Sequence, residues 1–296
     1  MTGLRNPVGT HVKVGPGLVK GTLKGARELG LEAVQVFTGN PRGWALSEGR
    51  PAEDAAFREG CAESEIRVVI HAPYLVNLGS PTASTYERSV ASVAHNVRRA
   101  VEIGAEGVVV HTGSYVAQPG DQSGDDVPGL RAAALRRLRE GLLPILDTIS
   151  DDSLPWLLLE PTAGQGRSLC AGVADLAPYL DTLDHHPKAG ICLDTCHAFA
   201  AGEPLDEPGG TTLTVDRIIE IAGPGKLRLV HANDSQDPRG SMRDRHEKLG
   251  AGHIGTGAIA ELLAHPATAG VPFILETPGS RDPGSDQIAL VKGMRR

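Results

Sequence analysis

Eight short apolar runs recur along almost the whole chain, and longer segments with charged faces separate them. The hydrophobicity of each run is nearly continuous, which is typical of strands covered on both faces. The runs occupy residues 8–12, 33–37, 68–71, 108–111, 156–160, 191–194, 227–231 and 273–276. Helical patterns lie between them, for example at residues 84–104, 129–149, 173–183 and 258–264. A strand and a helix repeated eight times predict parallel strands joined by crossover helices.

Two folds can use this order, a closed eight-stranded barrel and an open doubly wound sheet. The glycine fingerprint of a dinucleotide-binding site follows none of the runs, and their number favours the barrel. Of the 296 residues 40% are hydrophobic, so the chain can bury a full core, although its length alone would also allow two domains. We expect a single α/β domain over residues 1–296 with the (β/α)8 TIM-barrel fold.

The last residue of each run is the most informative, because active sites of such barrels lie at the carboxyl ends of the strands. Six runs end on a residue that can bind a metal: His71, His111, Glu160, Asp194, His231 and Glu276. With 36 Asp and Glu and 11 His among 296 residues, chance would place about one such residue at eight ends. Packed together without cations, these groups would carry a large desolvation and repulsion cost, which divalent cations remove. The sequence therefore predicts a metal cluster at the carboxyl ends of the strands.

Two short motifs add further candidate ligands. In Asp194-Thr-Cys-His197 an imidazole follows the strand-end carboxylate by three residues, and Asp244-Arg-His246 offers two more side chains after the seventh run. The candidates exceed the roughly four ligands of one zinc ion, so they suit two or three ions. Nitrogen and oxygen donors without thiolate favour zinc or manganese over calcium or magnesium. Ions clustered in this way are suited to phosphodiester hydrolysis, because they generate hydroxide at neutral pH and stabilise the attacking and leaving oxygens.

The net charge of -7 argues by itself against binding to DNA or to an anionic membrane. Three divalent ions would bring the formal charge to about −1 and would place positive charge where a phosphate binds. No stretch is apolar over the roughly 18 residues of a membrane helix, and residues 1–15 lack the apolar core of a signal peptide. The four cysteines are irregularly spaced, so we expect buried thiols rather than disulfides. These features predict a cytoplasmic protein without a membrane partner.

Several segments form a specific set of motifs. The longer ones are HAPYLVNLG at residues 71–79, GICLDTCH at 190–197, HANDS at 231–235 and DRH at 244–246. The shorter ones are FTGN at residues 37–40, VHTG at 110–113, EPTAGQG at 160–166 and LETPG at 275–279. In this order, and over nearly the whole chain, they resemble the endonuclease IV family of apurinic/apyrimidinic endonucleases.

The resemblance implies a zinc-dependent barrel that cuts DNA on the 5′ side of a base-less sugar, leaves a 3′-hydroxyl and a 5′-deoxyribose phosphate, and also trims blocked 3′ ends. It implies three zinc ions, with manganese as an alternative in one position. By this resemblance His71, His111 and Glu160 hold the first ion, Glu160, Asp194, His231 and Glu276 the second, and His197, Asp244 and His246 the third. A hydroxide between the first two ions would attack phosphorus, which makes Glu160 and Glu276 the catalytic candidates.

The implied partner is duplex DNA with an abasic site, bound by a monomer. An enzyme that acts on such a nucleotide extracts it from the base stack, and side chains fill the gap left behind. Arg42, after the second run, and Tyr74 and Leu75, after the third, match family positions that open the duplex. The alternative interpretations are a solvated loop charge for Arg42 and rim packing for the other two.

Other polar residues are open to two interpretations. His11, at the first strand end, is expected to lie behind a ligand or to face substrate rather than to be a tenth ligand. The cluster of Arg239, Arg243, Arg245 and Lys248 is either a set of phosphate contacts or a solvated basic loop.

Two residues depart from the family pattern without removing a ligand. Gln236 stands where many members carry lysine, which would alter either a phosphate contact or a contact behind a ligand. Pro161 follows Glu160 and would alter the loop after the fifth run. The nearest alternative function is a metal-dependent sugar isomerase or epimerase, whose barrels also place His, Asp and Glu at strand ends but use one or two ions. The full set of candidate ligands disfavours it, and a non-catalytic metal-binding or DNA-scaffold protein is a more distant alternative.

Overall fold

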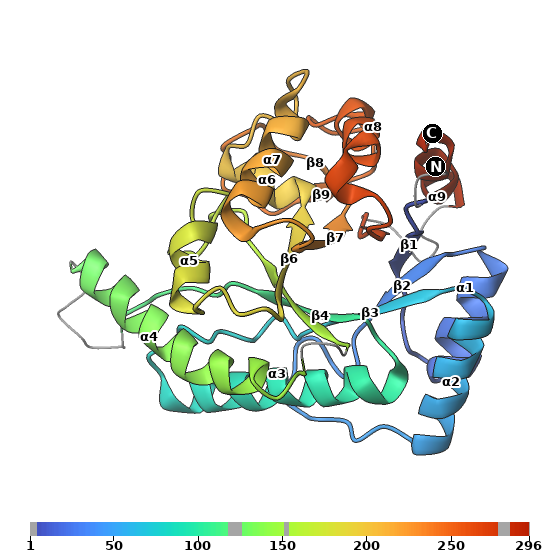
Figure 1. The fold of residues 1–296 in the computed structure, drawn as a ribbon, viewed down its shortest axis with the longest axis horizontal. Coiled ribbons are helices and arrows are strands. Elements are labelled where there is room, and N and C mark those ends of the chain that lie inside the picture. Colours follow the sequence, from blue (N-terminus) through green and yellow to red (C-terminus); the bar gives the residue numbers. More distant parts are fainter. Residues whose placement is uncertain (1–4, 118–125, 151–153, 278–284, 296) are drawn as a thin grey trace.

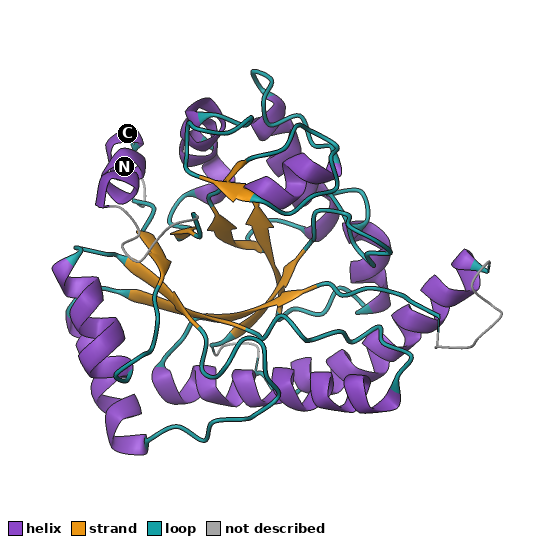
Figure 2. Cartoon of the chain, turned by 180° about the vertical axis from the view of Figure 1, so that it is seen from behind, coloured by secondary structure: helices purple, strands orange, loops and turns teal. Residues whose placement is uncertain are grey.

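The computed structural model describes residues 5–117, 126–150, 154–277 and 285–295. Eight parallel strands form a closed barrel, which confirms the expected fold, and Figure 2 shows them as a ring surrounded by helices. The barrel strands are β1 (Val8–His11), β2 (Ala33–Val36), β3 (Arg67–His71), β4 (Gly107–His111), β5 (Trp156–Glu160), β6 (Ala189–Asp194), β7 (Leu227–His231) and β10 (Phe273–Leu275). Strand β1 pairs with both β2 and β10, and this pairing closes the ring.

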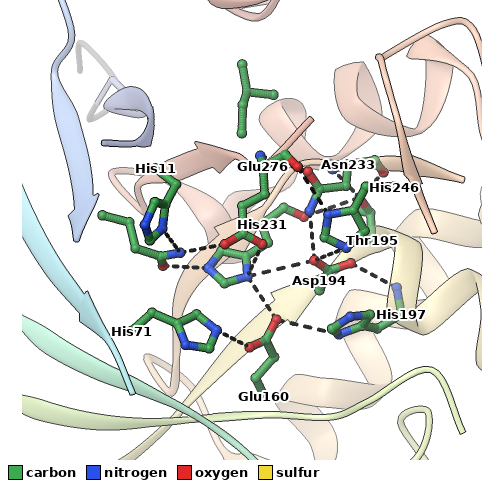
Figure 3. Close-up of polar contacts among 12 residues, drawn as sticks. His11, His71, Glu160, Asp194, Thr195, His197, His231, Asn233, His246 and Glu276 are labelled. Atoms are coloured by element: carbon green, nitrogen blue, oxygen red, sulfur yellow. Dashed lines mark hydrogen bonds and ion pairs between the residues drawn. The ribbon is translucent and has the colours of Figure 1, made fainter. Parts of the chain in front are cut away.

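The strand boundaries differ slightly from the predicted ones. Val12, Phe37 and Glu276 were expected to end the first, second and eighth strands, but each lies one residue beyond its strand. For Glu276 the reason is visible, because its backbone N–H donates to Oδ1 of Asn233 at 2.9 Å instead of to a neighbouring strand. Its side chain still lies at the mouth of the barrel (Figure 3).

Helices cover the outside of the ring, and the two longest, α3 and α4, lie side by side (Figure 1). The helices are α1 (Lys24–Glu28), α2 (Pro51–Glu63), α3 (Ala83–Ile103), α4 (Val127–Leu146), α5 (Leu176–Thr182), α6 (Thr195–Ala201), α7 (Gly210–Ala222), α8 (Thr256–Ala264) and α9 (Ser285–Met294). Helix α3 ends at Gly104, whose φ of 72° is the left-handed conformation that glycine adopts at helix ends. The segment predicted at 173–183 becomes helical only from Leu176 to Thr182, and the N–H of Val173 donates to the Glu203 carboxylate at 2.9 Å. None of the described helices combines the length and hydrophobicity needed to cross a membrane.

The barrel interior is built by the two-residue alternation of its strands. One buried apolar layer consists of Ala33, Val69, Val109, Leu158, Cys192, Leu229 and Ile274. The residues two positions further along the chain are Gln35, His71, His111, Glu160, Asp194, His231 and Glu276. The alternation that packs the core therefore also directs these polar side chains into the barrel at its carboxyl end.

Strand β1 approaches β2 very closely in the same layer of the barrel. A Cβ atom on Gly9 would lie 1.6 Å from the carbonyl oxygen of Ala33. Only glycine permits this spacing, so Gly9 allows the backbones of β1 and β2 to approach each other closely.

Candidate metal centre

Glu160, at the end of β5, lies at the centre of the barrel mouth and is 1% exposed. Figure 3 shows it between His71, His231 and His197. Four imidazole nitrogens surround its carboxylate: His71 Nε2 at 3.3 Å, His111 Nε2 at 3.2 Å, His231 Nδ1 at 2.9 Å and His197 Nδ1 at 3.5 Å. Because three of these histidines end strands β3, β4 and β7, closure of the barrel is what brings them to one carboxylate.

His231 links Glu160 to two further carboxylates. Its Nδ1 atom lies 3.3 Å from Oε2 of Glu276 and 3.7 Å from Oδ2 of Asp194. The imidazole is fully buried. The ends of β5, β6, β7 and β10 therefore converge on one nitrogen atom.

The Asp-Thr-Cys-His motif forms the junction between β6 and α6. Asp194 caps α6, because its Oδ1 accepts a hydrogen bond from the backbone N–H of His197 at 2.8 Å. This cap holds His197 in the first helical turn, with its imidazole directed toward the barrel mouth (Figure 3). The other carboxylate oxygen, Oδ2, accepts from Nδ2 of Asn233 at 2.8 Å. The three-residue spacing of the two candidate ligands is thus the spacing of a helix cap.

Asp244 and His246 come from the segment after β7, which forms a small antiparallel hairpin of β8 (Asp234–Ser235) and β9 (His246–Glu247). Nε2 of His246 lies 3.1 Å from Oδ1 of Asp244 and 3.6 Å from Oδ2 of Asp194. Nε2 of His197 lies 3.2 Å from the same Asp244 oxygen. The hairpin therefore brings its two candidate ligands next to those of α6.

The nine predicted ligands form one connected cluster of overlapping groups. In each group, one nitrogen, oxygen or sulfur atom from every residue lies within 4.8 Å of the others. The groups are His71, His111 and Glu160; Glu160, Asp194, His231 and Glu276; Asp194, His197 and His246; Cys196, Asp244 and His246; and Glu160, Cys192 and His231. Glu160 and Asp194 each belong to more than one group, so neighbouring cations would share carboxylates.

Three buried atoms of the cluster lack a hydrogen bond of good geometry despite their close neighbours: Glu160 Oε2, His197 Nε2 and His246 Nε2. Buried polar atoms are rarely left in this state. A cation bound between the carboxylates and imidazoles would satisfy all three. The residues present therefore fit divalent metal ions.

Charges within the cluster balance one another when it holds no cation. Burial opposes ionisation of Glu160, but the charges of His231 and His111 hold the pKa of its carboxyl well below the usual range. Burial also opposes charge on His197 and His246, but nearby carboxylates, chiefly that of Asp194, raise their pKa values to about 10 and about 9. A protonated imidazole cannot bind a cation through the protonated atom, so loading the cluster with metal releases protons.

Two polar residues that the sequence did not single out also enter the centre. Gln35, on β2, bonds both to Nε2 of His231 at 2.8 Å and to Oε1 of Glu276 at 2.6 Å. Asn233 joins the Asp194 side chain to the backbone of Glu276. The sequence feature that could have indicated Gln35 is a single amide residue inside an apolar run. The alternation of the strand places its side chain inside the barrel.

The four cysteines are free and buried, as expected. The sulfur of Cys192 lies within 4.8 Å of ligand atoms of Glu160 and His231, and Cys196, which lies in α6, stands equally close to Asp244 and His246. Burial raises the pKa of the Cys192 thiol to about 12 and also raises that of Cys196. Without a cation, both thiols therefore stay protonated at neutral pH.

The three residues predicted to open DNA lie on the rim of the barrel. Tyr74 is 52% exposed and Leu75 is 37% exposed, and Arg42 is also exposed. The backbone N–H of Tyr74 donates to the carbonyl oxygen of Pro41 at 3.0 Å, so the two loops are joined. The ring centroid of Tyr74 lies 5.6 Å from that of His71. The Tyr74 ring therefore lies beside the cluster, and the bond to Pro41 holds the loop of Arg42 next to it.

The basic residues after β7 are partly neutralised. Arg243 and Arg245 both pair with Asp237, at 3.5 Å and 2.5 Å. Arg239 lies 3.3 Å from Asp206 and 2.6 Å from a second carboxylate. These partners support the interpretation of a solvated loop for the three arginines.

The two departures from the family pattern are accommodated locally. Gln236 braces the hairpin, since its side-chain amide donates to the His246 carbonyl oxygen at 2.9 Å. The carbonyl oxygen of Pro161 lies 3.2 Å from Nδ1 of His197.

His11 lies next to Gln35, with Nδ1 3.2 Å from the amide nitrogen, and burial lowers its pKa to about 4. It therefore stands behind Gln35 rather than among the candidate ligands.

The chain resembles known proteins over almost its full length. Residues 23–295 match a family model described as a xylose isomerase-like TIM barrel. The chain is 52% identical over 291 residues to the probable endonuclease 4 of Streptomyces coelicolor, a match that covers 98% of this chain and 96% of that protein. It is 33% identical over 290 residues to the probable endonuclease 4 of Halothermothrix orenii, covering 98% and 99%.

Solved structures give the same relationship. The endonuclease IV from Thermus thermophilus has a TM-score of 0.82 at 33% identity, and the match covers 97% of this chain and 98% of that one. A D-tagatose 3-epimerase-like protein has a TM-score of 0.67 at 20% identity, covering 97% and 95%, and shares the fold alone. The chain belongs to the endonuclease IV family, within the xylose isomerase-like TIM barrels.

Proposed function

We propose that the protein is a DNA-repair endonuclease that hydrolyses the phosphodiester bond 5′ to an abasic site in duplex DNA. The products are a 3′-hydroxyl and a 5′-deoxyribose phosphate, and the same centre removes blocking groups from 3′ ends. The observation that carries the proposal is the overlap of the ligand groups through Glu160 and Asp194 in a chain similar to proteins named endonuclease 4. Carboxylates shared in this way suit the clustered cations of phosphodiester hydrolysis.

Zinc is the cation best suited to this donor set, with manganese as an alternative in one position. The proposed ligands are His71, His111 and Glu160 for the first of three ions, and Glu160, Asp194, His231 and Glu276 for the second. For the third ion we propose His197, Asp244 and His246, because Nε2 of each imidazole lies 3.2 Å or less from Oδ1 of Asp244. Bound there, the ions would lower the pKa of water and stabilise negative charge at a phosphoryl group.

The chain itself supplies a place for the substrate beside these ligands. A cavity of about 460 Å³ adjoins the cluster, and its walls include Glu276, His246, Tyr74, His11 and Lys13. This volume accommodates a sugar with its flanking phosphates. The cavity would hold the extruded abasic nucleotide with the scissile phosphate directed at the candidate ligands.

The rim residues would keep the substrate in this position. Arg42, Tyr74 and Leu75 would fill the gap that the extruded nucleotide leaves in the duplex. The loops that carry them are joined by the hydrogen bond from Tyr74 to Pro41, so the wedge would act as one unit. We further propose that the protein acts on duplex DNA as a monomer in the cytoplasm.

Incision of a defined oligonucleotide tests the proposal. The zinc-loaded protein is incubated with a duplex that carries one abasic site, and the ends of the products are identified by mass spectrometry. We expect one cut on the 5′ side of the abasic site and a 3′-hydroxyl that a polymerase extends. The same duplex without the abasic site is the control and stays intact. An intact abasic duplex, in the presence of protein that holds its ions, contradicts the proposal.

A sugar isomerase or epimerase is the alternative function, and the fold shared with the epimerase-like protein motivates it. Such an enzyme needs one or two ions and a base beside a carbonyl carbon. Elemental analysis that finds about three zinc ions per chain argues against it, because that number exceeds the need of a single carbonyl centre. Interconversion of ketohexoses without DNA incision would favour it.

A further inference from the structure

Gln35 occupies an unusual position for an amide. It lies on β2 among the apolar residues Ala33, Val34 and Val36, and it is fully buried. An apolar side chain would suit the strand equally well, because every other residue of β2 is apolar. A buried amide is costly unless hydrogen bonds satisfy it. The reason for glutamine at this position therefore lies in its hydrogen-bond partners.

Three partners from three other strands or strand ends meet this amide. Nε2 of Gln35 lies 2.6 Å from Oε1 of Glu276 and 3.2 Å from Nδ1 of His11, and its Oε1 lies 2.8 Å from Nε2 of His231. Figure 3 shows His11, His231 and Glu276 facing one another across the barrel mouth. The amide thus links β1, β7 and the residue after β10.

The chemistry of these partners fixes the orientation of the amide. A carboxylate can only accept a hydrogen bond, so the Gln35 atom that faces Glu276 is the donor Nε2. The atom that faces His231 is then the carbonyl oxygen, which can only accept. His231 must therefore carry a proton on Nε2. Its other nitrogen, Nδ1, faces the carboxylates of Glu160, Asp194 and Glu276.

We propose that Gln35 is a positioning residue of the metal centre: it keeps the proton of His231 on Nε2, so that Nδ1 is free to bind a cation, and it fixes the orientation of the Glu276 carboxylate. The role rests on the metal centre proposed above. A hydrogen bond to the distal nitrogen of a metal-binding histidine sets its tautomer and ring orientation. Here the donor and acceptor of one side chain act on two candidate ligands of the same group.

Substitution of methionine for Gln35 tests this role, because Q35M keeps the length of the side chain and removes both polar atoms. Zinc affinity is measured by competition with a chromophoric chelator, and elemental analysis gives the number of ions retained. We expect zinc affinity to fall about tenfold to a hundredfold at the site that contains His231 and Glu276. Removal of a hydrogen-bond partner of a metal ligand typically has an effect of this size. The matched control is Q287M, whose glutamine accepts a hydrogen bond from the backbone of Leu249, outside the cluster.

A spectroscopic measurement on the unsubstituted protein keeps the test independent of how Q35M folds. In long-range ¹H–¹⁵N spectra of the zinc-loaded protein, we expect His231 to be protonated on Nε2, with slow exchange of that proton. Q35M, which lacks the acceptor oxygen, loses the slow exchange of the His231 Nε2 proton. Protonation of His231 on Nδ1 in the zinc-loaded protein overturns the proposal.

The outcomes distinguish a wrong role for Gln35 from a wrong metal centre. If the unsubstituted protein holds ions and Q35M holds them equally tightly, the role of Gln35 is wrong and the metal centre stands. If the unsubstituted protein holds no divalent ion, the metal centre is wrong and the role of Gln35 falls with it. Weaker zinc binding in Q35M with unchanged binding in Q287M supports the proposal.

Discussion

At the scale of single residues, the properties of the centre depend on one carboxylate with four imidazoles around it. Glu160 is fully enclosed by the barrel, and its charge is held by His231 and His111. A carboxylate in this position would help to neutralise any cations bound between it and the imidazoles. An amide of the same shape would present N–H groups to atoms that need an acceptor.

The first prediction concerns this charge. E160Q and E276Q keep the shape of the side chain, but each should lower the incision rate more than about a hundredfold. Even residues that only hydrogen-bond to a metal ligand contribute up to that factor. Zinc content should fall, while the circular dichroism spectrum stays that of the unsubstituted protein. The control is E203Q, whose side chain accepts a hydrogen bond from the Val173 N–H outside the cluster. Unchanged turnover in E276Q would refute a catalytic role for Glu276.

The second prediction concerns the wedge. R42A and Y74A should raise the KM for abasic duplex by roughly tenfold, which corresponds to one lost stacking or phosphate contact. Their zinc content should not change, because neither side chain belongs to a ligand group. R58A is the control for loss of an exposed arginine, since Arg58 on α2 donates to the Glu102 carbonyl oxygen at 3.0 Å, outside the cluster. Equal KM values for R42A and R58A would leave Arg42 without a role in binding.

At the scale of elements, the strands were predictable because a short apolar run repeats eight times and each run ends near a polar residue. The candidate ligands followed from the same runs, since parallel strands of a barrel end at one mouth. Gln35 and Asn233 could not be found in this way. Their partners lie up to 241 residues away in sequence, and hydrogen bonds at such separations have no local pattern. The hairpin of β8 and β9 has only two residues in each strand, which is too short to give a periodic signal.

The buried polar residues of α3 also have partners that the sequence did not reveal. They hold residues 37–50, the segment that carries Arg42. Arg99 donates to both carboxylate oxygens of Asp54 on α2, at 2.7 Å and 2.9 Å, and to the carbonyl oxygen of Glu48 at 3.4 Å. Asn96 accepts from the hydroxyl of Thr38 at 2.8 Å. The sequence pattern gave an amphipathic helix but not the partners of its buried polar groups.

The third prediction follows from this anchor. R99M should lower the free energy of unfolding by about 3 kcal/mol, because it leaves the Asp54 carboxylate buried without its partner. Limited proteolysis should cut the 37–50 segment faster, and the KM for abasic duplex should rise without loss of zinc. R98M, which changes the exposed neighbouring arginine, is the control. A stable R99M with normal proteolysis would show that the segment is held by other contacts.

At the scale of the whole molecule, the ring is closed where the ends of the chain meet. Strand β1 pairs with β10, and α9 packs beside β1 (Figure 1). Glu32 joins these parts, since it accepts hydrogen bonds from the Val8 N–H at 3.0 Å and from Arg295 at 2.5 Å. Burial opposes its ionisation, but Arg295 and Val8 hold the pKa of its carboxyl below the ordinary value of 4.5.

The fourth prediction is the pH dependence of this closure. A carboxyl whose pKa is lowered in the folded state stabilises that state above its unfolded pKa and loses the effect as the pH falls. E32Q should therefore be less stable than the unsubstituted protein at pH 7, by about 1 kcal/mol after allowance for solvent screening. The difference should narrow as the pH falls below about 4.5. Urea titrations at several pH values measure it, with the exposed E63Q as control, and a constant difference would contradict it.

The charge of the whole chain has a different meaning once the centre is located. Four of the acidic residues behind the net charge of -7 lie in the cluster. Cations bound there would place positive charge next to the cavity that would receive a phosphate. The acidic composition therefore does not argue against a DNA substrate.

The most direct test of the account is a titration of metal-free protein with zinc, in which bound ions and incision of an abasic duplex are measured on the same samples. Incision should be absent without metal and should reach a plateau when about three ions are bound per chain, because the ligand groups act together. A plateau at one ion, or no incision at full loading, would contradict it.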